Sequence, residues 1–324
     1  STLITSSAAS DVYKRQWNGI AHDDLRSYVD DALARLPAAC LTSGCDRHDD
    51  PHATRAADTA YGLLDGDDRF LDAVVTRLPA YDETELNAML AYQDAYDARP
   101  TGAALERYRA AALLGSTEGA GSGFDGRTDA DFMRVHIAPL LTERGYSPTV
   151  LEQGVDTRAH DDVLRPGHGV VMYAGHGQRT RLAAPEVTID DLLAWRDARD
   201  ALPLWVNVGC NVGEYALYGH ERCFQEMAIR HGAAIVSFGS SRFQFWLPPM
   251  YAQFGIADEL YADAPIHELI LHGLHHMVAM VGVDGVHEML FWNVAGHVGT
   301  RLRTPVREPV LSMTRADVRA LYQD

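Results

Sequence analysis

The chain has 324 residues, of which 28 are basic and 45 acidic, so its formal net charge at pH 7 is −17. Apolar residues make up 47% and charged residues 23% of the chain, which is close to the average for globular proteins and excludes a disordered, collagen-like or disulfide-stapled class. No apolar stretch approaches the ~18 residues of a membrane span. The negative net charge argues against nucleic acid as a partner, because phosphate binding requires clustered Lys and Arg.

The first 16 residues differ in composition from the rest of the chain. The only lysine, Lys14, lies in this Ser-rich segment, whereas every other basic residue is an arginine. Because the segment resembles the adapter-derived translation found at the ends of some reading frames, we interpret residues 1–16 as a sequencing scar and exclude them from the fold prediction. We therefore expect the native N-terminus to be missing.

Residues 17–108 are predicted to form a small N-terminal α/β subdomain. Helical periodicity with acidic residues in the first turn occurs at Asp23–Leu36 and at Glu83–Tyr96, and an apolar stretch, Leu71–Val75, lies between them.

The chain has four cysteines, namely Cys40, Cys45, Cys210 and Cys223. They form no paired CxxC zinc motif, and they are too few to staple a protein of this size with disulfides. The cysteines therefore do not indicate whether the protein works in an oxidising or a reducing compartment.

From residue 109 onward, short apolar runs alternate with helical segments. The apolar runs are Ala110–Leu114, Thr149–Leu151, Gly169–Tyr173, Leu204–Val208 and Ala233–Phe238. The helical segments between them are Asp129–Arg144, Ile189–Arg199 and Arg222–Arg230. This alternation is typical of βαβ units and a parallel sheet. A helix-rich stretch, Ala264–Met280, a further segment, Met289–Val298, and an Arg-rich extension at residues 309–324 complete the chain.

Two of the predicted strands are followed by side chains suited to nucleophilic catalysis. His176 follows Gly169–Tyr173 and lies between two glycines, and Cys210 follows Leu204–Val208. Because the helix between these strands supplies one right-handed crossover, we expect the strands to be neighbours whose ends meet at one edge of the sheet. A histidine within hydrogen-bond reach would stabilise a thiolate at Cys210.

Other groups at this edge fit the same chemistry. The backbone amides of Gly177 and Cys210 would face the developing oxyanion of an acyl-transfer reaction. Glu118 follows the first strand and would fix the tautomer of His176. The residues alone leave a plainer interpretation open, in which His176 lies in a Gly-rich turn, Cys210 is a buried small apolar residue and Glu118 is a solvated carboxylate.

A glycine-rich segment after the first strand competes with this interpretation. Gly119–Gly123 resembles part of a dinucleotide-binding fingerprint, and Glu152 ends the following strand where a ribose-binding acid is expected. The position three residues after Gly121 is Phe124 rather than glycine, so the spacing of the fingerprint fails.

A histidine cluster is a second competitor, formed by His267, His272, His275 and His276. His272 and His276 are one helical turn apart and could chelate zinc or nickel. No third ligand has the spacing of a catalytic zinc motif, so we expect a solvated or capping face and no metal or cofactor for catalysis.

Longer motifs surround the candidate residues. They read Tyr173-Ala-Gly-His-Gly177, Gly209-Cys-Asn-Val-Gly213, Cys223-Phe-Gln-Glu-Met-Ala228, Gly232-Ala-Ala-Ile-Val-Ser-Phe-Gly-Ser240 and Trp292-Asn-Val-Ala-Gly296. This combination resembles the catalytic core of the gingipain-like cysteine peptidases, which are relatives of caspases and legumain. The resemblance covers about residues 57–305, including upstream motifs similar to the N-terminal subdomain of that family.

The resemblance implies an α/β fold, a caspase-like parallel-sheet sandwich at residues 109–308 with a smaller N-terminal α/β subdomain. Within it, Cys210 would be the nucleophile, His176 the general base and acid, and Glu118 the carboxylate that orients the histidine.

The resemblance also implies a specificity pocket. Asp129, Trp246 and Met250 fall where arginine-specific members build the pocket for the residue before the scissile bond. A carboxylate at the floor of such a pocket would pair bidentately with a guanidinium. Asp129 could instead cap the helix that it begins.

The sequence departs from the family pattern at several positions. Gln178–Arg181 follows the histidine without the expected aromatic residue, and its two arginines could disfavour a basic substrate. Thr76 replaces an expected glycine, so the N-terminal subdomain is incomplete or altered. Structural calcium is common in the family, and the acidic residues that could donate oxygens to it are Asp65, Asp67 and Asp68.

The sequence therefore predicts a cysteine endopeptidase that hydrolyses peptide or protein substrates through an acyl-enzyme at Cys210, with a preference for arginine before the scissile bond. By resemblance to its bacterial relatives, it is expected to be secreted or at the cell surface. A sortase-like transpeptidase of a secretion system and a catalytically silent binding module are the alternatives.

Overall fold

The structure is a computed structural model. It describes residues 58–64, 71–98, 102–119, 127–154, 159–195, 200–215, 222–261 and 263–303. The helix predicted at Asp23–Leu36, the segment 1–16 and the extension 309–324 lie outside the described residues.

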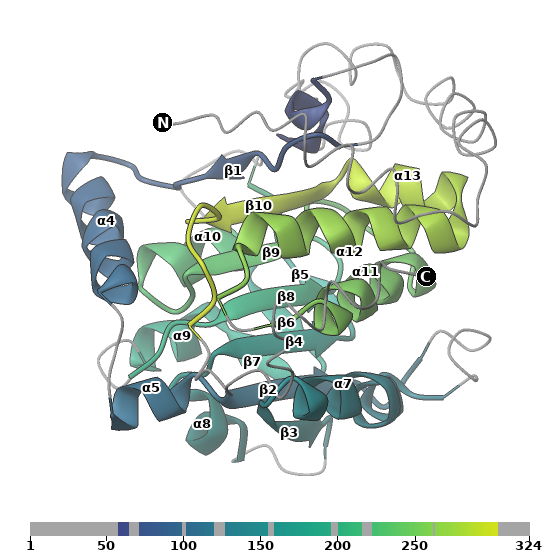
Figure 1. Cartoon of the computed structure of the whole chain (residues 1–324), viewed down its shortest axis with the longest axis horizontal. Helices are drawn as coiled ribbons and strands as arrows, with labels where there is room; N and C mark the ends of the chain where they lie inside the picture. The colour runs from purple at the N-terminus through teal and green to yellow at the C-terminus, as the bar shows by residue number, and fades with distance from the viewer. Residues whose placement is uncertain are drawn as a thin grey trace, which may run out of the picture.

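A seven-stranded, mainly parallel sheet forms the centre of the molecule, in the order β1-β10-β9-β8-β4-β2-β3 (Figure 1). Its strands are β1 (Thr76–Arg77), β2 (Ala110–Gly115), β3 (Ser147–Glu152), β4 (Val170–Ala174), β8 (Leu204–Val208), β9 (Val236–Ser240) and β10 (Trp292–Gly296). β10 runs antiparallel to β9, and every other neighbouring pair is parallel. The predicted α/β class with a parallel sheet is thus confirmed, with one reversed strand that the sequence did not indicate.

A small antiparallel sheet follows β4 directly. It consists of β5 (Gly177–Gln178), β6 (Arg181–Ala183) and β7 (Glu186–Thr188). These strands were not predicted, because elements of two or three residues are too short to show an alternating pattern.

The helices lie where the periodicity indicated, with several additions. They are η1 (Asp58–Gly62), α4 (Glu83–Asp97), α5 (Ala103–Arg107), α6 (Asp129–Phe132), the π-helix η3 (Met133–Ile137), α7 (Ala138–Glu143), α8 (Ala159–Leu164), α9 (Ile189–Trp195), α10 (Phe224–Arg230), α11 (Leu247–Asp258), α12 (Ile266–Val281) and α13 (Val283–Met289). The helix predicted at Asp129–Arg144 is thus three consecutive pieces with a π-helical turn in the middle. The apolar stretch Leu71–Val75 forms no helix or strand.

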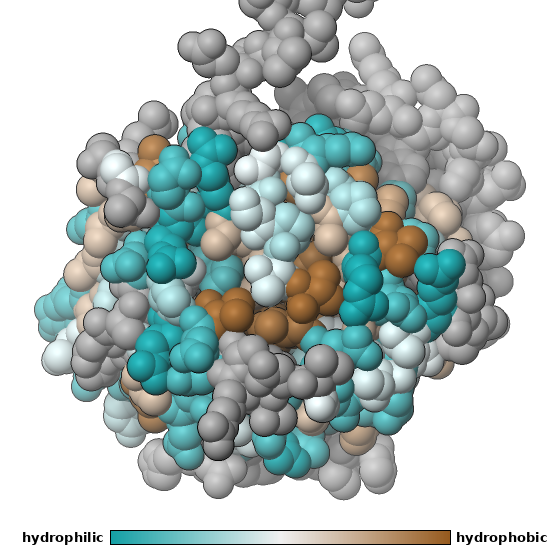
Figure 2. Space-filling model, turned by 90° about the horizontal axis from the view of Figure 1, so that it is seen from below, coloured by the Kyte–Doolittle hydropathy of each residue, from teal (hydrophilic) through white to brown (hydrophobic). Residues whose placement is uncertain are grey.

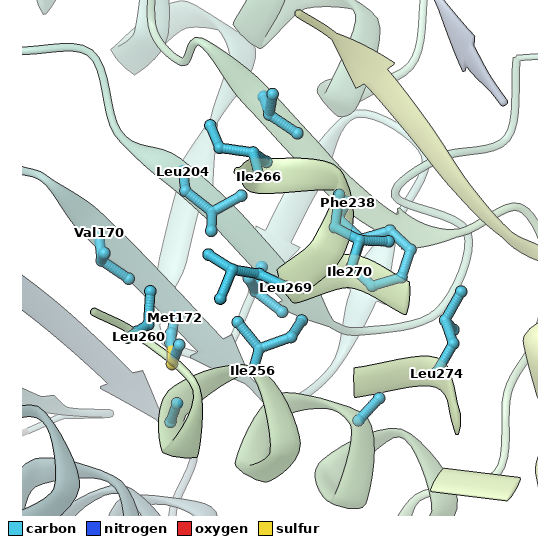
Figure 3. Packing of buried hydrophobic residues seen from close by; sticks show 14 of the residues in the cluster. Val170, Met172, Leu204, Phe238, Ile256, Leu260, Ile266, Leu269, Ile270 and Leu274 are labelled. Carbon is cyan, nitrogen blue, oxygen red and sulfur yellow. The ribbon is translucent and has the colours of Figure 1, made fainter. Parts of the chain in front are cut away.

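Side chains alternate between the two faces of the sheet and build one apolar cluster on each. In β2, Leu113 belongs to the cluster under α7, α11, α12 and α13, whereas Leu114 belongs to the cluster under α9 and α10. β4 and β8 alternate in the same way, because successive residues of a strand point to opposite faces. Figure 3 shows strand residues such as Met172 and Phe238 packed against Ile256 of α11 and Ile270 of α12. The result is a three-layer α/β/α sandwich that fixes the strand ends rigidly.

The segment before residue 109 contributes to the same sheet. β1 pairs with β10 at the edge of the sheet, and the hydroxyl of Thr59 donates to the carbonyl oxygen of Trp292 at 2.8 Å. Asp58, buried in this segment, accepts hydrogen bonds from the guanidinium of Arg77 at 2.5 and 2.7 Å.

The face seen from below the view of Figure 1 is largely hydrophilic, with a short apolar strip near its centre (Figure 2). In the part of the chain that the structure describes, no helix combines the length and apolarity that a bilayer crossing requires.

Candidate active site

The carboxyl ends of three neighbouring strands meet in register. Gly115 of β2 lies opposite Ala174 of β4, which lies opposite Val208 of β8. The prediction that the strands leading to His176 and Cys210 are neighbours is therefore confirmed. The loops after β2, β4 and β8 begin side by side at this edge.

His176 and Glu118 come together at this edge. The Nε2 atom of His176 lies 2.9 Å from Oε2 of Glu118, although 58 residues separate them in the chain. Their side chains are 48% and 61% exposed, so both reach the solvent at the edge of the sheet. Glu118 is therefore a partner of the imidazole rather than only a solvated turn carboxylate.

The backbones of Gly177 and Cys210 abut. A Cβ atom built on Gly177 would lie 2.5 Å from the carbonyl oxygen and 2.8 Å from the amide nitrogen of Cys210, so only glycine fits there. Gly209 likewise packs against the Tyr173 ring and Gly177. The two amides named for an oxyanion hole thus belong to one compact patch of backbone, and Cys210 is partly exposed beside it.

Tyr173 holds the loop that carries the histidine. Its hydroxyl donates to the carbonyl oxygen of His176 at 2.5 Å and accepts from the amide of Ala184 at 2.9 Å. Burial raises the pKa of Tyr173, so its hydroxyl stays protonated and remains a donor. Sequence reasoning missed this residue because it counted Tyr173 only as part of an apolar strand.

Asp129 is fully buried behind His176. Oδ2 accepts a hydrogen bond from the hydroxyl of Ser116 at 2.6 Å, and Oδ1 accepts one from Nε1 of Trp246 at 2.8 Å. Burial raises the pKa of Asp129 to about 6, and the hydrogen bonds from Ser116 and Trp246 oppose that shift. Ser116 was missed in the sequence, although its place directly after a strand is a usable signal.

The alternative that Asp129 caps its helix is wrong. Thr128 is the N-cap residue of α6, and its hydroxyl accepts a hydrogen bond from the amide of Asp131 at 3.1 Å. The carboxylate of Asp129 points instead to Ser116 and Trp246.

Trp246 connects the pocket residue to the histidine. Its ring packs edge-to-face on His176, with the ring centroids 4.9 Å apart. Met250 lies one turn further along α11 and is buried in the apolar core, with 2% of its surface exposed. The structure thus unites Asp129, Trp246 and His176, whereas Met250 lies in the apolar core.

The two arginines after His176 are engaged locally. Nε of Arg179 donates to the carbonyl oxygen of Glu214 at 3.2 Å. Arg181 donates to Gln178 at 2.9 Å and to Glu186 at 2.7 Å. The ion pair with Glu186 balances the charge of Arg181.

A cavity of about 840 Å³ lies apart from this site, between α4, α9, α10 and the β5–β7 sheet. The three arginines that line it are each paired with a carboxylate, Arg181 with Glu186, Arg222 with Glu226 and Arg230 with Glu85.

Cys223 is more deeply buried than Cys210. It is 1% exposed, and burial raises the pKa of its thiol, so it stays protonated and inert. Cys40 and Cys45 lie outside the described residues.

The expectation of a solvated or capping histidine face on α12 is wrong for His275. His275 is buried, with Nε2 3.2 Å from the carbonyl oxygen of Leu71, and burial lowers its pKa to about 4. His272 and His276 are half-buried, and burial lowers the pKa of each. Among the described residues, no group of three or more His, Cys, Asp or Glu side chains is placed to hold a metal ion.

The other two candidate sites gain no support. Glu152, proposed for a ribose, accepts a hydrogen bond from Arg134 at 2.9 Å. The three acidic residues suggested for calcium, Asp65, Asp67 and Asp68, lie outside the described residues.

A cysteine and an imidazole–carboxylate pair thus follow neighbouring strands of an α/β sandwich, an arrangement that suits nucleophilic catalysis by a thiol. A sequence model of Peptidase family C25 matches residues 18–287. The chain therefore belongs to this family, the gingipain family, and is a hydrolase of the cysteine peptidase class.

Solved structures of similar fold agree with the family. One described as the Arg specific cysteine proteinase gingipain R (RGPB) has a TM-score of 0.68 and 19% identity, and the match covers 90% of this chain and 77% of that one. A complex of Porphyromonas gingivalis RgpB pro- and mature domains gives a TM-score of 0.69 at 19% identity, covering 87% and 77%. A structure titled only as a protease gives 0.64 at 17% identity, covering 93% and 70%. The comparison with curated proteins gives no match.

Proposed function

We propose that the protein is a thiol endopeptidase in which Cys210 and His176 form the catalytic dyad and arginine is preferred before the scissile bond. The observation that carries this proposal is the edge where Glu118 bonds the imidazole at 2.9 Å while Gly177, the next residue after His176, packs on the backbone of Cys210.

The bond to Glu118 selects the nitrogen that takes part in proton transfer. A carboxylate accepts a hydrogen bond, so the neutral imidazole carries its proton on Nε2, which leaves the lone pair of Nδ1 as the base. The thiol of Cys210 transfers its proton to this nitrogen, and the sulfur attacks the carbonyl carbon of the substrate.

The remaining steps follow from the same groups. The amides of Gly177 and Cys210 stabilise the oxyanion that forms. His176 then returns the proton to the leaving amine, the peptide C–N bond breaks, and an acyl-enzyme remains at Cys210. Water, deprotonated by His176, hydrolyses this thioester and restores the thiol.

Asp129 supports the preference for arginine. An ionised carboxylate offers about four lone-pair sites, so Asp129 can bind a guanidinium and keep its hydrogen bonds from Ser116 and Trp246. The indole of Trp246 is beside it and offers a flat apolar surface to the side chain of the substrate.

The proposal is tested with fluorogenic peptides that carry Arg, Lys, Asp or Ala before the cleavable bond, under reducing conditions. Cleavage after Arg is expected to disappear in Cys210→Ala and to persist in Cys223→Ser, which alters the buried thiol. Equal activity of the wild type and Cys210→Ala would overturn the dyad, and cleavage after Ala but not Arg would overturn the pocket. An added amine acceptor distinguishes transpeptidation, because it would appear in the product.

Two further expectations stay proposals. We propose action outside the cell or at its surface, because the bacterial relatives that the sequence resembles act there. We also propose structural calcium at Asp65, Asp67 and Asp68, for which a lowered melting temperature after chelation, reversed by calcium, is the expected result.

A further inference from the structure

The loop of residues 241–246, here called the Trp246 loop, joins the parts of the site. Trp246 at its end contacts His176 and Asp129. Near its start, the carbonyl oxygen of Arg242 accepts a hydrogen bond from the amide of Asn211 at 2.9 Å, next to Cys210.

The two halves of this loop are held differently. The first half is fixed by backbone bonds, since the amide of Ser241 donates to the carbonyl oxygen of Phe291 at 2.9 Å and Arg242 accepts from Asn211. The second half depends on side chains. The amide of Phe245 donates to Oε1 of Glu288 at 3.0 Å, and Gln244 accepts from the indole of Trp292 at 3.1 Å.

Glu288 reaches the loop from α13 and is fully buried. The same Oε1 atom accepts a hydrogen bond from Nη2 of Arg242 at 3.1 Å, and the guanidinium of Arg242 lies over the Phe291 ring at 4.2 Å. One carboxylate oxygen thus binds both halves of the loop. Removing one partner of such a buried pair is costly, because the other charge is left without its partner in a site from which water is excluded.

The exposure of the aromatic residues of the loop indicates why the hydrogen bonds to Glu288 matter. The side chains of Phe243 and Phe245 are 65% and 53% exposed, so neither is buried in the apolar core. Trp246 directly follows the amide that Glu288 binds, and its ring must keep a fixed position to contact both His176 and Asp129.

We propose that Glu288 is a positioning residue of the active site, which through Arg242 and the amide of Phe245 holds Trp246 against His176 and Asp129. This inference rests on the proposed function, because the pocket that it shapes is the one assigned there to arginine. The proposed role concerns the contacts of Trp246 with Asp129 and His176. It leaves the loop of Cys210 in place, because the amide of Asn211 is held by the backbone carbonyl oxygen of Arg242.

The test compares Glu288→Gln with Glu226→Gln. Glu226 is a matched control because it is also a buried glutamate that accepts a backbone amide, from Cys223 at 2.9 Å, and an arginine, Arg222. Glu288→Asp, which keeps the charge, is the second variant should the glutamine variant fold poorly.

The first measurement is the rate of alkylation of Cys210 by two reagents. Iodoacetamide needs only the thiol, whereas an arginyl chloromethyl ketone also needs the pocket. Glu288→Gln is expected to lose about tenfold or more in rate with the arginyl reagent, because a displaced pocket disturbs orientation, and to keep the iodoacetamide rate within about threefold of the wild type. An equal effect on both rates, or none on either, would overturn the proposal.

The second measurement needs no catalysis. An adjacent imidazole quenches the fluorescence of an indole, so the component of emission lost in Trp246→Phe, measured at one fixed pH, should report whether Trp246 lies against His176 and Asp129. The intensity of this component is expected to be the same in Glu226→Gln as in the wild type, and to change in Glu288→Gln. An unchanged component in Glu288→Gln would refute the positioning role. A wild type that gives the signal but no Cys210-dependent cleavage would refute the proposed function alone.

Discussion

Replacing Asp129 with asparagine should remove the selectivity for arginine while leaving the fold nearly intact. Asparagine has the same shape, and the surroundings suit it. Its amide oxygen can accept from Nε1 of Trp246, and its amide nitrogen can donate to the hydroxyl of Ser116. That hydroxyl can in turn donate to the carbonyl oxygen of Glu118, 3.3 Å away. The free energy of unfolding should therefore fall by only about 1 kcal/mol.

The loss of charge at Asp129 has a larger effect on substrate choice. A hydrogen bond to a charged group contributes about 1.5–3 kcal/mol, so Asp129→Asn should lower the kcat/KM ratio of arginine over citrulline substrates by about 10- to 150-fold. Citrulline is the neutral isostere of arginine, so its kcat/KM serves as the internal control and should change less than about threefold. An unchanged ratio in a folded variant would refute the assignment of Asp129 to the pocket.

Three other perturbations have defined outcomes. As the pH falls through about 6, Asp129 becomes protonated, so the ratio of arginine to citrulline kcat/KM should fall, whereas a pH-independent ratio would contradict the raised pKa. Gly177→Ala places a methyl group 2.5 Å from the carbonyl oxygen of Cys210 and should lower kcat by about 100-fold with either substrate; a near-normal kcat would remove this backbone from the oxyanion site. Arg77→Met removes two hydrogen bonds from the buried carboxylate of Asp58 and should cost about 2 kcal/mol in urea unfolding, because the Arg77 side chain is 47% exposed and water screens the pair; Asp58→Asn should restore most of this loss in the double variant.

The central strands were predictable because their residues are apolar throughout, as buried parallel strands require. β8 spans Leu204–Val208, as predicted. β9 was placed three residues too early, because the amides of Ala233 and Ala234 bond back to the carbonyl oxygen of Ala228 and close α10. The reversed direction of β10 depends on its pairing with β9, and the direction of a strand cannot be predicted from the periodicity of its own residues.

The part of the candidate site that lies directly after the strands was predictable from the sequence. His176, Cys210 and Glu118 were located from the rule that loops at the carboxyl edge carry the chemistry. The hydrogen bond between Trp246 and Asp129 joins residues that are 117 positions apart in the chain, and such a contact cannot be predicted from residue spacing. The same limit explains the wrong expectation for His275 of α12, which is buried with its imidazole against the carbonyl oxygen of Leu71.

The short strand β1 has a consequence for handling the protein. It covers one side of β10 at Val294 and Ala295, and the hydroxyl of Thr76 donates to the carbonyl oxygens of Val294 and Gly296 at 3.3 and 2.9 Å. A chain beginning at residue 109 would leave those backbone groups open along a strand, and open strands recruit other copies. We therefore expect the segment before residue 109 to hinder aggregation, so that a chain without it precipitates under conditions in which the full chain stays in solution.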